Sequence, residues 1–280
     1  SMSSQIILAD NNSQDGTIDA VKTKFPEVII IENKDNLGFS AANNQCFGIC
    51  EGEYILMLNP DAMLVDHSFQ KMFDYLSKIQ DSEFVLIGPK LINTDNTNQI
   101  SCWKFPSPIQ HLLELCFLNT LFDTTTYKQY DLKEAKQVDF LSGACILMKK
   151  STLIVLKGLD INLFWMDDAD LGKRNILNGG QNIYFPDTIV KHHIGQSSKK
   201  NQNVVISNQI ISKLKFYKKH KQYFYFYCSI PIFLLQILSR IPLFFILGIV
   251  KTMYFVKAKA YTYTLSKFFN YLVLGNQNPT

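Results

Sequence analysis

Three carboxylates close together are the residues of this sequence best suited to chemistry. Asp167, Asp168 and Asp170 stand within four positions, and Lys173 and Arg174 follow them. Acidic residues in a first helical turn and basic residues later suit the helix dipole, so capping alone is one explanation. The carboxylates also repel one another, which raises the pKa of at least one. A carboxylate with a raised pKa can act as a general base, and this is the second explanation.

A single carboxylate, Asp61, follows a short apolar run. Residues 54–57 are typical of a buried strand, and the sequence Asn59-Pro60-Asp61-Ala62 favours a tight turn after it. In open α/β sheets, ligands bind beyond the carboxyl ends of the strands. Oxygen ligands at that place suit Mg²⁺ or Mn²⁺, and the alternative is a turn without a ligand.

Two polar turns earlier in the chain also follow expected structure. Asp10 ends an apolar run and opens the turn 10–16, which favours either contact with a ligand or an Asx turn without one. The segment 36–44 is a turn that enters a helix, and Gly38 permits a close backbone approach that a side chain would block. The start of a helix can face an anion. The alternative here is a capped helix with small packing residues.

Strand and helix patterns alternate along the first part of the chain, which predicts an α/β fold with a mostly parallel sheet. Ser40 is expected to cap the second helix. Later the pattern loosens, and we expect a hairpin with a polar tip at residues 93–99 and an irregular stretch over 104–137. The expected strands are 5–9, 28–31, 54–58, 85–88, 90–92, 100–103, 138–141, 144–148, 183–185 and 189–192, and the expected helices are 18–25, 40–50, 69–76, 109–118 and 168–178.

Composition limits the class of protein. The 280 residues can bury a large core in one or two domains. A net charge of +4 and a pI near 8.6 are too mild for a protein whose main partner is nucleic acid. The six cysteines form no Cys-x-x-Cys pair and no zinc-finger spacing, so we expect reduced core residues.

The composition changes late in the chain. Residues 1–210 carry the motifs described above and are expected to form the catalytic domain, and residues 211–280 are rich in lysine and aromatic side chains. The uncharged stretch 222–239 barely reaches the length of a membrane-spanning helix, and Arg240 and Pro242 interrupt the apolar run. We expect helices that lie in the membrane interface with lysines near anionic headgroups. A dimer interface and a transmembrane hairpin are the alternatives.

Five motifs in order resemble glycosyltransferase family 2, and most closely its bacterial rhamnosyltransferase-type members. They are residues 10–17, 36–44, 59–61, 142–144 and 167–171. The resemblance implies the GT-A nucleotide-diphospho-sugar transferase fold, which is a Rossmann-like mixed sheet flanked by helices. It also implies a strand and a helix before Asp10 that this sequence does not contain. Either the sequence is truncated or the protein lacks this unit, and we expect both cases to weaken activity.

The resemblance assigns roles to individual residues. It makes Asp168 the catalytic base, beside Asp167 at a place where the family usually has glutamate. Asp61 and His192 are the implied metal ligands, with His193 as the second choice to His192. The implied nucleotide-binding residues are Asp10, Asn12, Gly38, Asn43 and Asn59, of which Asp10 would accept a hydrogen bond from N3–H of uracil or thymine.

The activity implied by the resemblance is an inverting transfer of a sugar, with rhamnose on dTDP as the expected donor and UDP as the second carrier. The acceptor would be a glycan or a polyprenyl-linked sugar, and a divalent cation (Mg²⁺ or Mn²⁺) would neutralise the leaving diphosphate. The expected pathway is surface polysaccharide synthesis. The protein would be peripheral to the cytoplasmic face of a bacterial inner membrane, and a homodimer is a further expected partner state.

Two other functions stay open at this point. One is a non-catalytic, degenerate glycosyltransferase-like subunit or membrane-binding module. The other is a nucleotidyltransferase, which usually needs a glycine-rich and basic phosphate loop that this sequence does not contain.

Overall fold

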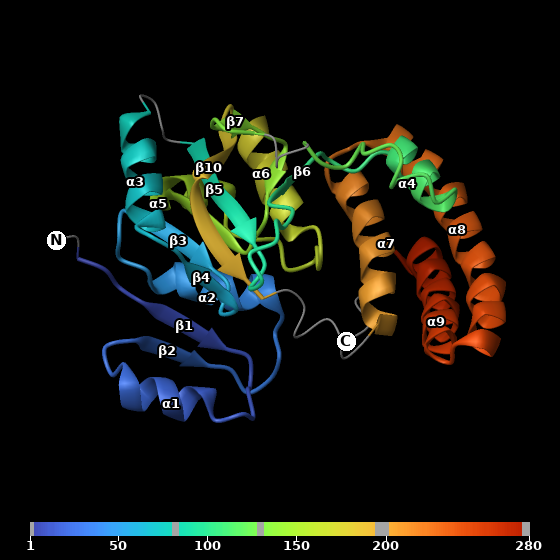
Figure 1. Ribbon diagram of the computed structural model, residues 1–280, viewed down its shortest axis with the longest axis horizontal. Helices are drawn as coiled ribbons and strands as arrows, with labels where there is room; N and C mark the ends of the chain where they lie inside the picture. The colour runs from blue at the N-terminus through green and yellow to red at the C-terminus, as the bar shows by residue number, and fades with distance from the viewer. Residues whose placement is uncertain (1–2, 80–83, 128–131, 194–201, 276–280) are drawn as a thin grey trace. The chain divides into compact units, whose positions relative to one another are not determined.

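The chain forms two compact units in the computed structural model (Figure 1). The structure describes residues 3–79, 84–127, 132–193 and 202–275. Unit 1 combines Ser1–Trp103 with Tyr127–His193, and unit 2 combines Lys104–Thr126 with Ile194–Thr280. The segment 104–126 therefore leaves unit 1 and returns to it, although it folds with the C-terminal part of the chain.

A mixed sheet forms the core of unit 1. Its strands follow the order β3-β9-β5-β10-β4, and β7 pairs with β10. β5 and β10 run parallel, whereas β9 lies antiparallel to both β3 and β5. The bounds are Tyr54–Leu58 (β3), Ala62–Leu64 (β4), Val85–Ile92 (β5), Lys136–Gln137 (β7), Cys145–Lys149 (β9) and Gln181–His192 (β10). The mixed sheet implied by the resemblance is confirmed, and the mostly parallel sheet is wrong because β9 enters between β3 and β5.

The main sheet is covered on both faces, which explains its nearly continuous apolar strands. Successive residues of β5 pack into opposite clusters: Leu86 joins one with Leu153 and Leu171, and Ile87 joins the other with Met72. The first cluster includes α5 (Lys150–Leu156) and α6 (Asp167–Leu177), and the second includes α3 (Ser68–Lys78). This alternation follows from the period of two in a strand.

The first two strands form a sheet of their own. β1 (Ile7–Asp10) and β2 (Ile29–Glu32) pair in parallel, and α1 (Thr17–Lys24) connects them. Among the described residues β3 is the end of the main sheet, and no described strand lies between it and β1. α2 (Phe39–Ile49) follows β2 and leads on to β3. The single sheet expected from the sequence is therefore divided.

Long-range pairing corrects two local expectations. The strands expected at 183–185 and 189–192 are one strand, β10, with a shift of register between them. The hairpin around residues 93–99 is limited to one isolated bridge. Cys102–Trp103 (β6) pairs instead with Phe140–Leu141 (β8), because β9 and β10 already occupy the two edges of β5.

Buried amides hold α6 against the sheet. Asn182 of β10 donates hydrogen bonds to the carbonyl oxygens of Asp139 at 2.7 Å and Gly172 at 3.0 Å. Asn175 of α6 donates to Asn182 Oδ1 at 2.9 Å. Gly172 permits this close approach, since a β-carbon there would lie 2.7 Å from Cβ of Phe140. The start of α6 is thus positioned by contacts along the rest of the helix.

Unit 2 is built from helices. They are α4 (Pro108–Leu115), α7 (Gln202–Lys219), α8 (Tyr223–Val250) and α9 (Met253–Leu274). Its core is aromatic, and the fully buried side chains include Phe216, Tyr217, Phe233 and Phe268. Among the described residues, α8 is the one helix long and apolar enough to cross a membrane.

The interruption of the apolar run at Arg240 and Pro242 does not divide the helix. α8 continues through Pro231 and Pro242 as one helix of 28 residues. Arg240 is buried, and its guanidinium donates to the carbonyl oxygens of Glu114 and Leu115. A buried charge with such partners does not need to end the helix to reach water.

We predict that Asn182→Ala lowers the free energy of unfolding by about 2–4 kcal/mol, because it leaves several buried polar groups without partners. Urea denaturation followed by circular dichroism measures the change. Asn178→Ala is the control, since this side chain donates to the Arg174 carbonyl at an exposed position. An equally small loss in both variants would contradict the anchoring role of Asn182.

Candidate active site

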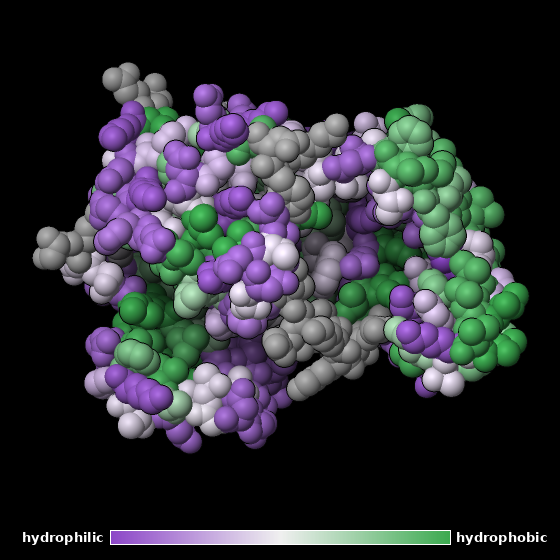
Figure 2. All heavy atoms as spheres, in the orientation of Figure 1, coloured by the Kyte–Doolittle hydropathy of each residue, from purple (hydrophilic) through white to green (hydrophobic). Residues whose placement is uncertain are grey.

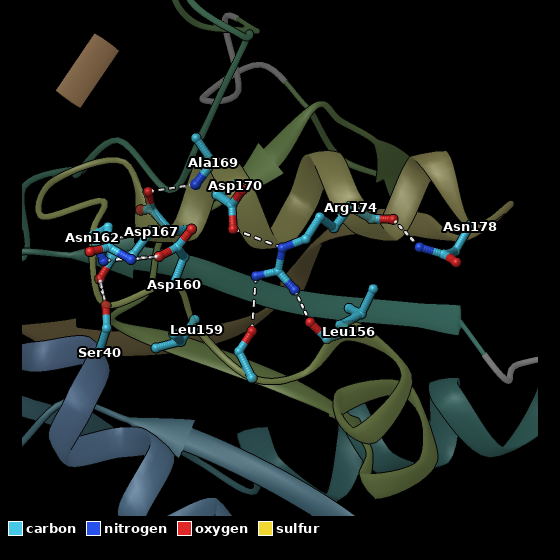
Figure 3. A network of polar contacts seen from close by, with 12 residues as sticks. Ser40, Leu156, Leu159, Asp160, Asn162, Asp167, Ala169, Asp170, Arg174 and Asn178 are labelled. Carbon is cyan, nitrogen blue, oxygen red and sulfur yellow. Dashed lines mark hydrogen bonds and ion pairs between the residues drawn. The ribbon is translucent and has the colours of Figure 1, made fainter. Parts of the chain in front are cut away.

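The three aspartates of α6 have different partners (Figure 3). The hydroxyl of Ser40 donates to Asp167 Oδ2 at 2.8 Å in a buried contact. Asp170 accepts from Arg174 Nε at 2.7 Å, and the same guanidinium donates to the Gly158 carbonyl at 2.9 Å. Asp170 is therefore used in a structural ion pair, which leaves the other two carboxylates for chemistry.

Asp168 combines partial exposure with a raised pKa. Its oxygens accept from Ala169 N–H at 2.8 Å and Gly143 N–H at 3.4 Å. Burial, and next the charge of Asp167, raise the pKa of Asp168 to about 7, against the lowering effect of those two N–H groups. Burial also raises the pKa of Asp167, although the bond from Ser40 opposes this. A pKa near 7 suits a general base at neutral pH.

The turn after β3 brings Asp61 to His192. Asn59 N–H donates to the Ala144 carbonyl at 2.9 Å, and Ala62 N–H donates to the Asn59 carbonyl at 3.0 Å. β4 then pairs antiparallel with the end of β10, so that Ala62 lies opposite His192. As a result, His192 Nε2 lies 3.1 Å from Asp61 Oδ1, and both side chains keep some exposure.

Gln99 orients the imidazole of His192. Its Nε2 donates to the His192 carbonyl at 3.3 Å and to Asn93 Oδ1 at 3.0 Å, and its Oε1 lies 2.9 Å from His192 Nδ1. The side-chain nitrogen of Gln99 faces two oxygens, both of which are acceptors, so its side-chain oxygen Oε1 is the atom that faces the imidazole. Nδ1 of His192 must therefore carry the hydrogen of that contact. In that tautomer, the lone pair of His192 Nε2 faces Asp61 Oδ1. Two acceptor atoms 3.1 Å apart need a proton or a cation between them.

The Asp61–His192 pair fits a divalent cation. Neighbouring ligands of a six-coordinate ion lie about 3 Å apart when each bond is about 2.1 Å, which matches the observed separation. In the described part of the chain, no group of three His, Cys, Asp or Glu side chains is close enough to hold a metal. Two protein ligands suffice where a bound diphosphate supplies others, as is common for Mg²⁺.

The predicted nucleotide-binding residues of the first turn make local contacts. Oδ2 of Asp10 accepts from the N–H of Ser13, three residues on, at 3.0 Å, whereas an Asx turn bonds the residue two positions on. Asn12 adopts a left-handed backbone with φ of 65°, and its Oδ1 accepts from Gln14 Nε2 at 2.7 Å. Both side chains therefore bond within their own turn, and the nucleotide-binding role of Asp10 and Asn12 stays a prediction.

The remaining candidates lie at the start of α2 and after β3. Gly38 has φ of 84°, and its N–H donates to Asn36 Oδ1 at 3.0 Å. Asn43 Nδ2 donates back to the Phe39 carbonyl at 3.0 Å within the helix. Oδ1 of Asn59 is buried and has no hydrogen-bond partner among the described residues. A buried acceptor without a partner is unusual in a folded protein and is suited to receive one from a ligand.

Short contacts connect the segments that carry the predicted site residues. The links are Asn11 to Gly38 (3.3 Å), Ser40 to Asp167 (2.8 Å), Gly143 to Asp168 (3.4 Å), Asn59 to Ala144 (2.9 Å) and His192 to Asp61 (3.1 Å). Residues far apart in the sequence therefore meet in one region of unit 1, around the starts of α2 and α6 and the ends of β1 and β3.

Two residues of this region were not found from the sequence. The expected cap at Ser40 is wrong, because Gly38 occupies the N-cap position and the Ser40 hydroxyl points to Asp167 instead. Gln99 gave no signal, because its partner His192 lies 93 positions away. In both cases the role comes from tertiary contact, which no local pattern encodes.

The comparisons with known proteins agree with this geometry. The family model of Glycosyl transferase family 2 matches residues 2–156, which is more than half of the chain. The chain belongs to glycosyltransferase family 2. An N-acetylglucosaminyl-diphospho-decaprenol L-rhamnosyltransferase of Mycobacterium tuberculosis is 29% identical over 209 residues, covering 69% of this chain and 67% of the relative. A poly(ribitol-phosphate) beta-glucosyltransferase of Bacillus spizizenii is 29% identical over 136 residues, covering 47% and 21%.

Solved structures share the fold of this family 2 glycosyltransferase. The mannosyltransferase PcManGT of Pyrobaculum calidifontis, in complex with GDP-Man and Mn²⁺, has a TM-score of 0.52 at 14% identity and covers 96% of this chain and 78% of its own. GalNAc-T7 with UDP, GalNAc and Mn²⁺ has a TM-score of 0.50 at 15% identity, with coverage of 76% and 43%. The predicted family and GT-A fold are confirmed.

We predict that Asp168→Asn makes the fold less sensitive to alkaline pH. The raised pKa of Asp168 means that its contribution to stability is complete below its unfolded pKa and is lost as the pH rises through about 7. The Asn variant should therefore gain roughly 2–4 kcal/mol over the parent between acidic and mildly alkaline buffer, since one pKa unit corresponds to about 1.4 kcal/mol. Urea titrations across this range measure it, and a constant difference would contradict the assignment.

We predict that Gln99→Leu weakens Mn²⁺ binding about 10–100-fold in the presence of dTDP, because the imidazole of His192 loses the partner that fixes its tautomer. Paramagnetic resonance titration measures the affinity, and ¹⁵N shifts of the ring report the tautomer directly. Gln70→Leu is the control, because that side chain bonds Asp74 on an exposed helix face. Equal affinity in both variants would exclude the positioning role.

Proposed function

We propose that this chain is an inverting glycosyltransferase that moves a sugar from a nucleoside diphosphate to a hydroxyl of a glycan or lipid-linked acceptor. The observation that carries the proposal is the carboxyl of Asp168, whose pKa is raised to about 7 in the region that also holds the Asp61–His192 pair. A base poised near neutral pH is what the attacking hydroxyl requires.

In the proposed reaction, the acceptor oxygen attacks the anomeric carbon from the face opposite the diphosphate. The new C–O bond forms as the bond to the diphosphate oxygen breaks, and the hydroxyl proton passes to the Asp168 carboxylate. The bond from Ser40 favours the charged form of Asp167, and the charge of Asp167 raises the pKa of its neighbour Asp168. Asp61 and His192 would hold Mg²⁺ or Mn²⁺, whose charge stabilises the leaving diphosphate.

The donor and acceptor are proposed from site chemistry and from the relatives. A carboxylate at Asp10 accepts a hydrogen bond from N3–H, which uracil and thymine present and cytosine lacks. Together with the rhamnosyltransferase relative, this favours rhamnose carried on dTDP, with UDP as the second carrier. The same relative acts on a prenyl diphosphate sugar by its name, and we propose an acceptor of that class here.

The proposed location is the cytoplasmic face of the bacterial inner membrane, in surface polysaccharide synthesis. Residues 1–210 would act as the catalytic domain, and residues 211–280 would associate with the membrane surface or form a homodimer. The apolar helix α8 supports the membrane association.

We predict that release of dTDP or UDP with a membrane extract as acceptor needs Asp168 and Asp61. Asp168→Asn should lower kcat/KM by about 100–10,000-fold, the usual contribution of a general base, and wild-type activity should rise with pH through about 7. Asp61→Ala should lower turnover and weaken Mn²⁺ binding together. Mass spectrometry of the products identifies the sugar.

Asp74→Asn, on the exposed face of α3, is the matched control and should retain full turnover. Full turnover in both site variants would contradict the assigned roles. Absence of metal-dependent dTDP or UDP binding by calorimetry would instead favour the non-catalytic subunit. Release of pyrophosphate would identify a nucleotidyltransferase.

A further inference from the structure

Buried polar contacts join the inserted segment 104–126 to the C-terminal helices of unit 2. His111 of α4 is fully buried, and its Nε2 lies 2.7 Å from the hydroxyl of Tyr217 in α7. Glu114 forms an ion pair with Lys213 at 3.3 Å. The residues on either side of this 23-residue segment belong to unit 1, and the segment itself is built into unit 2.

Arg240 completes this connection from the middle of α8. Its guanidinium donates to the carbonyl oxygens of Glu114 at 2.8 Å and Leu115 at 3.1 Å, and it lies 3.3 Å from the centre of the Phe117 ring. The last carbonyls of a helix lack partners inside that helix and carry partial negative charge. Arg240 therefore caps α4 and fixes the turn that follows it.

Beside these buried polar contacts, the segment presents large apolar side chains to the outside. Ile109, Leu112, Phe117, Leu121 and Phe122 are all exposed. The adjacent helix α8 exposes further large side chains, including Phe224, Phe245 and Ile249. Figure 2 shows hydrophobic side chains gathered over α4 and along α8. We call the exposed apolar residues of 109–122 and of α8 the apolar surface, and a continuous surface of this kind marks an interaction site.

Charge is divided unequally between the two units. By sequence, unit 2 has 13 Lys and Arg against 2 Asp and Glu, a net charge of +11, whereas unit 1 has 15 against 22, a net charge of −7. Helices α7, α8 and α9 contain no acidic residue. An apolar surface on a strongly cationic unit matches an anionic bilayer. A dimer formed through this same surface would instead bring together two units that each carry a net charge of +11, and these would repel one another.

We propose that unit 2 is a bilayer-docking module, in which the inserted segment 109–122 and α8 enter the headgroup region of an anionic membrane together. The inference deepens the proposed function and rests on its membrane-bound acceptor. α8 lies in the interface and does not cross, because Arg240 at its middle is bonded to the end of α4. The chain enters the inserted segment from unit 1 and returns to unit 1 after it, and a crossing α8 would have to draw the charged Arg240 contact into the hydrocarbon core.

The test is co-sedimentation of the full chain with phosphatidylcholine vesicles, with and without phosphatidylglycerol. Wild type should bind the anionic vesicles more tightly and lose affinity as salt is added. The double variant Leu121→Glu with Phe122→Glu should bind at least about tenfold more weakly, because two side chains can no longer be buried in lipid. Leu121→Ser alone should fall between the two, and thermal denaturation checks that each variant folds.

The matched control is Ile154→Glu with Leu177→Glu, which adds the same charge to unit 1. These residues are 65% and 66% exposed, close to the 74% and 57% of Leu121 and Phe122, and binding should not change. Unchanged binding of the Leu121 and Phe122 variant would overturn the proposal. So would a lipid-free dimer, seen by light scattering, that the same variant dissociates.

Activity separates this inference from the proposed function. Vesicle binding that needs Leu121 and Phe122, without any sugar transfer, would support the docking module and reject the transferase. Sugar transfer to a detergent-soluble acceptor by a protein that does not bind vesicles would support the transferase and reject the docking module.

Discussion

The buried hydrogen bond from Ser40 to Asp167 is the contact on which the site depends. It joins the starts of α2 and α6 across 127 positions of sequence. It favours the charged form of Asp167, and burial together with the charge of Asp167 raises the pKa of the neighbouring Asp168. One contact therefore joins the start of α2 to the acidic start of α6, where Asp168, the proposed base, lies next to Asp167.

Local sequence chemistry predicted the acidic helix start and the turn around Asp61, because both are set by neighbours within a few residues. It also predicted that Asp61 and His192 belong to one site, although only through the family resemblance. It failed where distant segments decide the outcome: β1 and β2 form a separate sheet, β9 runs antiparallel in the main one, and Arg240 is used inside unit 2. Strand pairing and the partners of a buried charge are long-range properties, which periodicity cannot encode.

The opposite charges of the two units suit two different partners. A net charge of −7 on unit 1 repels a nucleotide diphosphate, and this gives an electrostatic reason for a cation beside Asp61. The excess of lysine in unit 2 would instead draw the protein toward anionic lipid, where the proposed prenyl-linked acceptor would reside. Within unit 2, the inserted segment 104–126 is bonded to α7 through His111 and Glu114 and to α8 through Arg240.

Gly172 fixes how closely α6, the helix that carries Asp168, can approach the strand behind it. The nearest heavy atom to an added β-carbon is Cβ of Phe140, which belongs to a strand and has no flexible end that could swing aside. Any side chain at 172 would therefore push the whole acidic helix outward, one turn beyond Asp168. The position of Asp168, the proposed base, therefore depends on the small volume of a residue outside the candidate site, and a substitution there would alter turnover by displacing the carboxylate without removing it.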